Sequence, residues 1–191
     1  RIGDERIAVA GFTNLTRDHL DYHGTMENYF QAKRRVFTMC KTAVINIDDE
    51  YGKRLAQEFS DIAVTYSAEG NADYHAEFIR MNATGCSYML VNEREKTACR
   101  VDMNMTGLYN VQNSLCAIAM VTALGFDMTE CAKALSDLDG VDGRMNVVYR
   151  GDFTVITDYA HTDDALIKVL STLKPLTKGR LICVFGAAGD R

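Results

Sequence analysis

The sequence lacks long apolar runs, and this bounds the class of protein. The longest apolar stretch, residues 115–124, is interrupted by Thr122, so nothing reaches the roughly 18 apolar residues that a membrane span requires. The first six residues are rich in charge and lead into an apolar stretch without the order and length of a signal peptide. We therefore expect no membrane insertion and no secretion, which leaves a cytoplasmic protein.

Metal-binding cysteine patterns and blocks of like charge are also missing. The six cysteines are far apart and form no CxxC pair, and several lie in apolar surroundings, which predicts reduced core thiols of a cytosolic protein. The net charge of −5 is spread along the chain, which removes the usual electrostatic basis for nucleic-acid binding. We expect no nucleic-acid partner.

Several motifs of nucleotide and hydrolase chemistry are absent as well. No GxxxxGK[ST] phosphate loop occurs, since Gly52 and Lys53 lack the upstream glycine, and there is no GxGxxG. No serine or cysteine lies in a strand-turn-helix elbow, so a hydrolase triad is poorly supported. Nothing in this chain is expected to cradle a triphosphate by itself.

Apolar strand-like runs alternate with helix-period stretches in the first half of the chain. This rhythm is typical of an α/β fold with a mostly parallel sheet flanked by helices. Strands are predicted at residues 7–12, 43–47 and 62–66, with helices near 25–40 and 50–59. Three further alternating runs, at 74–81, 86–92 and 98–103, leave no room for crossover helices and predict a small antiparallel sheet.

The last third of the chain predicts a second domain. Helices are expected near 108–124 and 128–138, and residues 139–143 then concentrate turn formers. We place the boundary between a domain of residues 1–146 and one of residues 147–191. The second begins with a strand at 153–157, a helix at 163–173 and a strand at 181–185. One βαβ unit cannot close a core, so we expect this domain to be truncated.

Polar residues cluster at residues 13–24, directly after the first predicted strand. Ligand-binding groups of open α/β sheets gather beyond the carboxyl ends of strands, so this loop is a candidate site. The simpler interpretation is a helix-start loop rich in capping residues. In the following helix, Lys33 falls on the apolar face, seven residues after Met26. Lys33 either extends its amine to water or has a depressed pKa, and a neutral amine could add carbon dioxide to become an oxygen ligand for a metal.

Two more groups of polar residues follow. Asn110 and Asn113 share one side of a predicted helix, where two amides could read a nucleobase edge or simply cap loops. Asp158 and His161 precede a helix, where a ribose or phosphate would be met, although the neighbouring Thr162 could be no more than a helix cap. Arg144 lies in the glycine-bounded loop between the two domains and suits phosphate.

Taken together, these residues resemble the Mur ligase family, and the form of residues 18–24 resembles its MurE type. The pattern occurs in family order over the whole chain. It comprises residues 12–24 (FTNLTRDHLDYHG), Tyr29, Lys33, residues 46–49 (NIDD), residues 107–113 (GLYNVQN), residues 143–145 (GRM), residues 158–162 (DYAHT) and residues 184–191 (VFGAAGDR). The resemblance implies the family's central domain, followed by the start of its Rossmann-like C-terminal domain.

The resemblance implies an ATP-dependent ligase of peptidoglycan synthesis, acting as a monomer with ATP and Mg²⁺. ATP would phosphorylate the free D-glutamate carboxylate of UDP-N-acetylmuramoyl-L-alanyl-D-glutamate, and the amine of the third amino acid, such as lysine or meso-diaminopimelate, would displace phosphate. The residue roles implied by the family are a metal and catalytic role for His19 and a carbamylated Lys33, adenine for Asn110 and Asn113, phosphates for Arg144, ribose for Asp158, the interdomain site for His161, the UDP-sugar for Asn14, and the incoming amino acid for Arg191.

The family's phosphate loop and first acidic metal ligand are expected before residue 1, and its amino-acid specificity motif after Arg191. We therefore expect no turnover from this chain alone. Two other interpretations remain: another Mur-like amide ligase, such as one that adds glutamate to folate, and a binding module that has kept the fold and lost the chemistry.

Overall fold

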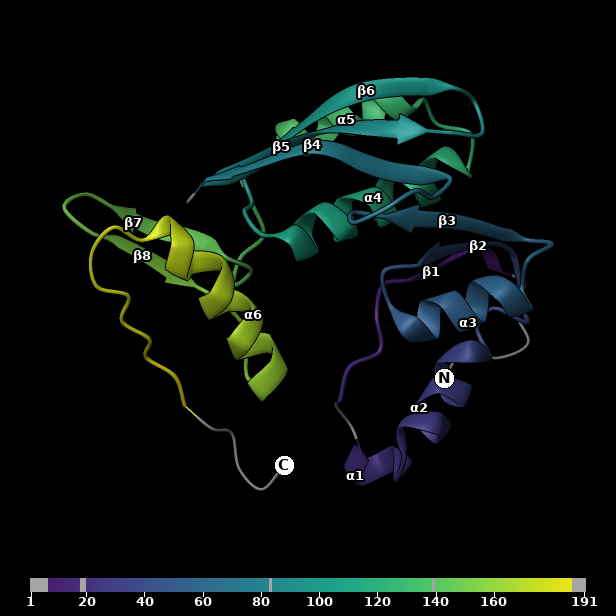
Figure 1. Ribbon diagram of the computed structural model, residues 1–191, viewed down its shortest axis with the longest axis horizontal. Coiled ribbons are helices and arrows are strands. Elements are labelled where there is room, and N and C mark those ends of the chain that lie inside the picture. The colour runs from purple at the N-terminus through teal and green to yellow at the C-terminus, as the bar shows by residue number, and fades with distance from the viewer. Residues whose placement is uncertain (1–6, 18–19, 83, 139, 187–191) are drawn as a thin grey trace.

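A computed structural model describes residues 7–17, 20–82, 84–138 and 140–186 of the chain. The strands are β1 Ile7–Phe12, β2 Cys40–Asn46, β3 Ala63–Ser67, β4 Tyr74–Asn82, β5 Gly85–Asn92, β6 Thr97–Met103, β7 Asn146–Arg150 and β8 Thr154–Thr157. The helices are α1 Leu20–His23, α2 Met26–Arg34, α3 Glu50–Glu58, α4 Leu108–Thr122, α5 Met128–Ser136 and α6 Asp163–Leu173, and a short 3-10 helix, η1, spans Lys174–Leu176. Figure 1 shows β1–β6 as one twisted sheet, with β7, β8 and α6 to one side of it.

The large sheet has the strand order β1-β2-β3-β4-β5-β6. The first three strands are parallel, and β4 pairs with β3 in parallel over a short stretch that includes Tyr66 and Tyr74. The strands β4, β5 and β6 are antiparallel. The predicted α/β class is confirmed, and the antiparallel strands extend the parallel sheet instead of standing apart from it.

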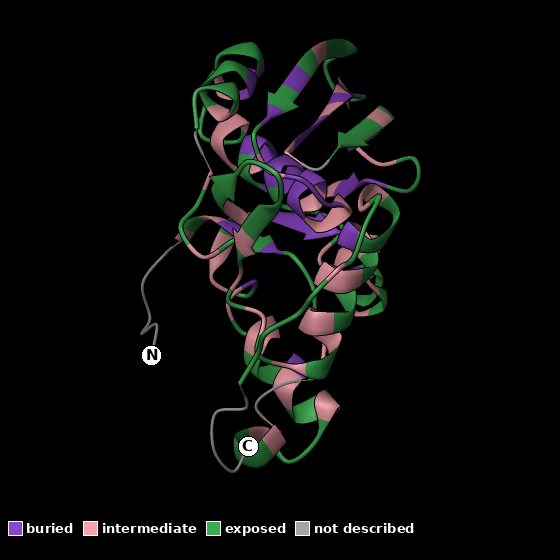
Figure 2. Ribbon diagram, turned by 90° about the vertical axis from the view of Figure 1, so that its left-hand side faces the viewer, coloured by how far each residue is buried: buried purple, intermediate pink, exposed green. Residues whose placement is uncertain are grey.

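Helices cover both faces of the parallel part of the sheet. α4 packs across β1–β4 on one face, and α5 packs on β6, while α3 packs on β2 and β3 from the other face. Side chains of β2 alternate between these layers: Val44 joins the cluster under α4, and Ala43 and Ile45 join the cluster with α2 and α3. Burial on both faces explains why Ala43, Val44 and Ile45 of β2 are apolar in succession. Figure 2 shows the buried residues gathered in the centre of the molecule.

Side chains cap the first turns of α2 and α3. Asp49 accepts the backbone N–H groups of Tyr51 and Gly52 at the start of α3, and Thr25 accepts that of Asn28 at the start of α2. The helix predicted for residues 25–40 is too long, since α2 ends at Arg34 and is followed by turns whose backbone hydrogen bonds join residues three positions apart. The apolar periodicity beyond Arg34 marks burial of Phe37 in the core, not continued helix.

The region after residue 145 combines a predicted helix with an unpredicted hairpin. α6 has the predicted bounds, whereas β7 was not predicted and pairs antiparallel with β8. The strand predicted at 181–185 does not form, and Ile182 and Val184 are 71% and 94% exposed. A strand needs a neighbour to satisfy its backbone groups, and no part of the chain that the structure describes pairs with this segment. Over the same described residues, no helix has the length and apolarity to cross a membrane.

Candidate functional site

A cavity of about 560 Å³ lies where the carboxyl end of β1, the start of α4 and the start of α6 come together. Six residues singled out from separate sequence motifs line it: Asn14, Asn110, Asn113, Arg144, Asp158 and His161. Lys33 is not in the lining, and His19 and Arg191 lie outside the described residues. The fold therefore brings together side chains that are up to 147 positions apart in the sequence.

The loop that carries Asn14 is fixed by the end of β2. Asn46, 3% exposed, donates from its amide to the carbonyl oxygen of Thr13 at 2.8 Å. The carboxylate of Asp49, which also caps α3, accepts the N–H of Leu15 at 3.1 Å. The buried Leu15 anchors the loop in the core. Residues 46–49 belong to the family pattern, and in the structure Asn46 and Asp49 bind the backbone of the loop after β1.

Gln112 is a pocket residue that the sequence did not single out. Its amide Nε2 donates to the carboxylate of Asp48 at 2.9 Å, and the same carboxylate accepts the N–H of Ala68 at 2.9 Å and the hydroxyl of Ser67. Because Asp48 takes the donor end of the Gln112 amide, the amide oxygen is the end that stays available as an acceptor. The only sequence signal was its place between Asn110 and Asn113.

The two asparagines at the start of α4 have different surroundings. Asn110 is buried and donates from its amide to the carbonyl oxygen of Thr106 at 2.8 Å, so it does cap a turn. Asn113 is exposed at the rim of the cavity. Beside them, the hydroxyl of Tyr109 is buried and has no hydrogen-bond partner in the described parts of the chain. Burial raises the pKa of Tyr109, and the nearby charge of Asp158 adds to this.

The third wall of the cavity is formed by the loop before β7 and the segment between β8 and α6. Asp158 accepts the backbone N–H groups of Met145 and Ala160, both at 2.8 Å. The guanidinium of Arg144 lies 5.0 Å from the ring centroid of Tyr159, in cation–π range. The ring Nδ1 of His161 lies 2.8 Å from the carbonyl oxygen of Tyr159, so this nitrogen carries the proton.

Lys33 is half-buried at the edge of the same region. Its ammonium donates to the carbonyl oxygen of Asn14 at 3.1 Å and lies 5.1 Å from the ring centroid of Tyr29 and 6.0 Å from that of Phe12. These contacts suit a protonated amine. Within the described ranges, no three His, Cys, Asp or Glu side chains gather closely enough to hold a metal ion.

Two protein-family models match the chain, one after the other. The model of the Mur ligase middle domain matches residues 1–121, and that of the Mur ligase glutamate ligase domain matches residues 143–191. The chain belongs to the Mur ligase family. The cavity lies between the two matched regions, with Asn14, Asn110 and Asn113 from the first and Arg144, Asp158 and His161 from the second.

Individual Mur ligases resemble the chain over nearly its full length. The UDP-N-acetylmuramoyl-L-alanyl-D-glutamate--2,6-diaminopimelate ligase of Clostridium botulinum is 40% identical over 183 residues, which cover 94% of this chain and 38% of that protein. A solved structure with the same enzyme name has a TM-score of 0.77 and 37% identity, covering 97% of this chain and 39% of that one. The MurF ligase of Thermotoga maritima in complex with ADP has a TM-score of 0.70, 17% identity and coverage of 87% and 39%, which shows the shared fold.

Proposed function

We propose that this chain forms the nucleotide-facing part of an ATP-dependent ligase that adds a diamino acid to UDP-N-acetylmuramoyl-L-alanyl-D-glutamate. The observation that carries the proposal is the cavity of about 560 Å³ lined by six residues from four family motifs. The relatives that match over most of the chain bear the name of the diaminopimelate-adding enzyme. The chain spans 38% of the relative from Clostridium botulinum, so the reaction belongs to a protein of the relatives' length.

The cavity offers each part of a nucleotide a matching group. Asn113 at the rim and the acceptor oxygen of Gln112 suit the donor and acceptor edge of adenine, with Asn110 fixing the turn beside them. The guanidinium of Arg144 suits phosphate, Asp158 can accept from ribose hydroxyls, and His161 stands at the opening between the matched regions. Asn14 lies on the opposite wall, where the UDP-linked substrate would enter. A carboxylate is a poor electrophile, so its oxygen attacks the terminal phosphorus of ATP and releases ADP. The amine then attacks the acyl phosphate and releases phosphate.

Magnesium would neutralise the charge that gathers on the transferred phosphoryl group. A protonated Lys33 offers no lone pair to a metal, whereas its carbamate would offer two oxygens beside the loop that carries Asn14. We assign His19 and carbamylated Lys33 to this metal and Arg191 to the incoming amino acid by family resemblance. The carbamate predicts a carbonyl resonance when the protein is incubated with ¹³C-labelled bicarbonate. If this resonance is absent from the wild-type protein both without and with magnesium, Lys33 is not part of the metal site.

The direct test is calorimetric titration with ADP of these 191 residues joined to the remaining parts of a relative's ligase, because the phosphate loop is expected before residue 1. We expect binding, and we expect Arg144→Ala to weaken it by about ten- to a hundredfold, because a charged hydrogen-bonding partner of phosphate is lost. Arg180→Ala is the matched control, since Arg180 is an exposed arginine outside the cavity lining. Equal loss in both variants, or no binding by the wild type, would contradict the assignment of this cavity to a nucleotide.

The second test addresses the substrate. These 191 residues, joined to the remaining parts of a relative's ligase, should add diaminopimelate or lysine to the muramoyl dipeptide, while the chain alone should give no product. A folate substrate with glutamate tests the other Mur-like amide ligases in the same panel. ADP binding without any ligation by the joined protein would favour a binding module of this fold.

A further inference from the structure

The loop at the start of the second matched region presents Arg144 to the cavity, and the segment after β8 contacts the residues on both sides of Arg144. Gly143, before it, accepts the N–H of Tyr159 through its carbonyl oxygen at 2.7 Å. Met145, after it, donates its N–H to Asp158 at 2.8 Å. The Arg144 side chain itself lies over the ring of Tyr159. The position of Arg144 is therefore set by residues 158 and 159, which lie 14 and 15 positions further along the chain.

The backbone of this loop is unfavourable at one position. Met145 has a φ of +49°, in the left-handed region that non-glycine residues rarely adopt. The neighbouring Gly140 and Gly143 also have positive φ, but glycine adopts this conformation without a steric penalty. Something outside the loop must hold Met145, because residues in such conformations persist only where the surroundings over-determine them.

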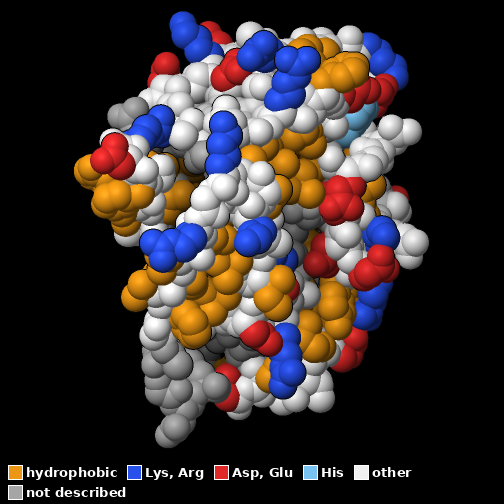
Figure 3. All heavy atoms as spheres, turned by 60° about the vertical axis from the view of Figure 1, so that its left-hand side comes forward, with side chains coloured by type: hydrophobic (Ala, Val, Ile, Leu, Met, Phe, Trp, Pro, Cys, Tyr) orange, Lys and Arg blue, Asp and Glu red, His pale blue; other side chains and the backbone are white. Residues whose placement is uncertain are grey.

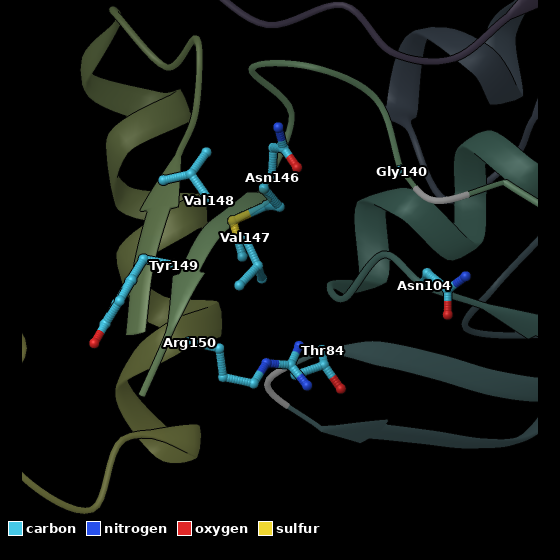
Figure 4. Close-up of a pocket in the computed structure, with 9 residues that line it drawn as sticks. Thr84, Asn104, Gly140, Asn146, Val147, Val148, Tyr149 and Arg150 are labelled. Carbon is cyan, nitrogen blue, oxygen red and sulfur yellow. The ribbon is translucent and has the colours of Figure 1, made fainter. Parts of the chain in front are cut away.

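On the far side of the loop, Met145 is buried, 3% exposed, but its side chain adjoins open space. A second cavity, of about 360 Å³, lies there and is lined by Gly140, Met145 and Asn146 together with Thr84 and Arg150 (Figure 4). In Figure 4 the loop runs along the edge of this cavity, with β7 on one side and the β4–β5 turn on the other. Within the loop, the N–H of Arg144 donates to the carbonyl oxygen of Val141 at 2.9 Å, and the hydrogen bonds to residues 158 and 159 join the loop to the segment after β8.

We propose that Asp158 is a positioning residue: its carboxylate clamps Met145 in the left-handed conformation and so places Arg144 in the cavity. One oxygen accepts the N–H of Met145 in the loop before β7, and the other accepts the N–H of Ala160 in the segment that carries Asp158. The two bonds go to different oxygens, and an amide would place a donor at one of these two positions, which explains why an acid suits this position. The link to phosphate binding rests on the proposed function; the clamp itself does not.

The clamp is tested without any ligand by NMR amide exchange of the 191-residue chain. In Asp158→Asn, one acceptor oxygen becomes a donor, so exchange at Met145 or Ala160 should accelerate by about tenfold or more, and the bond of Tyr159 to Gly143 should loosen with it. Asp163→Asn makes the same charge change five positions away, at an exposed residue outside the cavity lining, and should leave these amides unchanged. Unchanged protection in Asp158→Asn would overturn the proposal.

A rescue variant separates clamping from direct contact with a ligand. Met145→Gly in the Asp158→Asn background removes the backbone penalty, so protection of the Tyr159 N–H should recover most of its loss, and the affinity for ADP should recover the part that was lost through Arg144. Arg144→Ala added to each background measures that part. An effect of Arg144→Ala that is no larger with Met145→Gly than in Asp158→Asn alone would overturn the positioning role. If the wild type binds no ADP, the proposed function fails, and the Tyr159 amide alone decides on the clamp.

Discussion

The six-stranded sheet and the β7–β8 hairpin differ in what holds them in place. In β2, the residues Ala43, Val44 and Ile45 are fully buried between helices. Beyond Met145, Leu173 is the single buried apolar residue of the described part of the chain, and Figure 3 shows apolar side chains gathered at the surface there. The exposed apolar residues of this region are Val148, Tyr149, Phe153, Val155, Tyr159, Ile167, Ile182, Val184 and Phe185.

This difference divides the candidate site into two kinds of wall. Asn110 and Asn113 extend from α4, whose Val111, Leu115 and Ile118 are in the core. Arg144 and Asp158 stand on loops that polar contacts hold. Substitutions in the core should therefore change the stability of the whole chain, whereas substitutions after residue 145 should act locally.

The largest effect is expected for Leu115→Ala. Leu115 is fully buried in α4 between the sheet and α5, and truncation leaves a cavity that its neighbours cannot fill. We expect a loss of about 2–5 kcal/mol in the free energy of unfolding, measured by urea denaturation. Ile167→Ala on α6, where the side chain is 66% exposed, should cost less than about 0.5 kcal/mol. Similar losses for the two variants would abolish the contrast between the regions.

The second expected effect concerns the close approach of α3 to the end of β2. A Cβ added to Gly52 would lie 1.8 Å from the carbonyl oxygen of Asn46, which is backbone and cannot swing aside. Gly52→Ala should destabilise the chain by about 1–3 kcal/mol and also disturb the loop after β1, because Asn46 holds Thr13. Gly70→Ala, where the nearest atom would be at 3.8 Å, is the control and should remain close to wild type in urea.

Much of the first region was predictable because local signals and packing agree there. The strands β1 and β5 and the helix α3 follow their apolar patterns and caps within a residue or two, and in the second region α6 does the same. The prediction of a strand at 181–185 was wrong because an apolar run indicates burial or pairing but does not itself provide a neighbouring strand to pair with. The prediction of a helix to residue 40 was wrong because Phe37 would be buried in either conformation, so the apolar periodicity could not fix the backbone.

The candidate site was predictable as a set of residues but not as a set of contacts. Polar clusters at strand ends and helix starts located six of the lining residues. The bond between Gln112 and Asp48 joins residues 64 positions apart, and that between Met145 and Asp158 joins residues 13 apart across a turn. Such contacts depend on the final placement of loops, which no local pattern encodes.

A smaller, pH-dependent effect is expected at the junction of β3 and β4. Burial raises the pKa of Asp73, but hydrogen bonds from Arg94 and Thr65 outweigh it and hold the pKa below its ordinary value of 3.8. The unfolded chain therefore takes up this proton first as the pH falls. The stabilisation from Asp73 is full above the ordinary value and is lost as the pH falls through the lowered pKa.

Asp73→Asn should consequently be less stable than wild type near neutral pH, and the difference should shrink in acid. Urea midpoints at about pH 6 and about pH 3 measure this convergence. The control is Asp61→Asn, which removes the same charge at an exposed position near the start of β3. A gap between wild type and Asp73→Asn that stays constant with pH would show that the hydrogen bonds, and not the ionisation of Asp73, account for its contribution.

The smallest effect is expected in the hairpin itself. The rings of Tyr149 and Phe153 lie 4.8 Å apart between centroids, and both side chains are about half exposed or more. Phe153→Ala should weaken the hairpin by about 0.5–1 kcal/mol, seen as faster exchange of the Gly151 N–H that donates to the carbonyl oxygen of residue 153 at 3.0 Å. The global urea midpoint should not move. A shift of that midpoint comparable to the one in Leu115→Ala would mean that the hairpin unfolds together with the sheet, and the wall that carries Arg144 would then owe its position to the core as well as to Asp158.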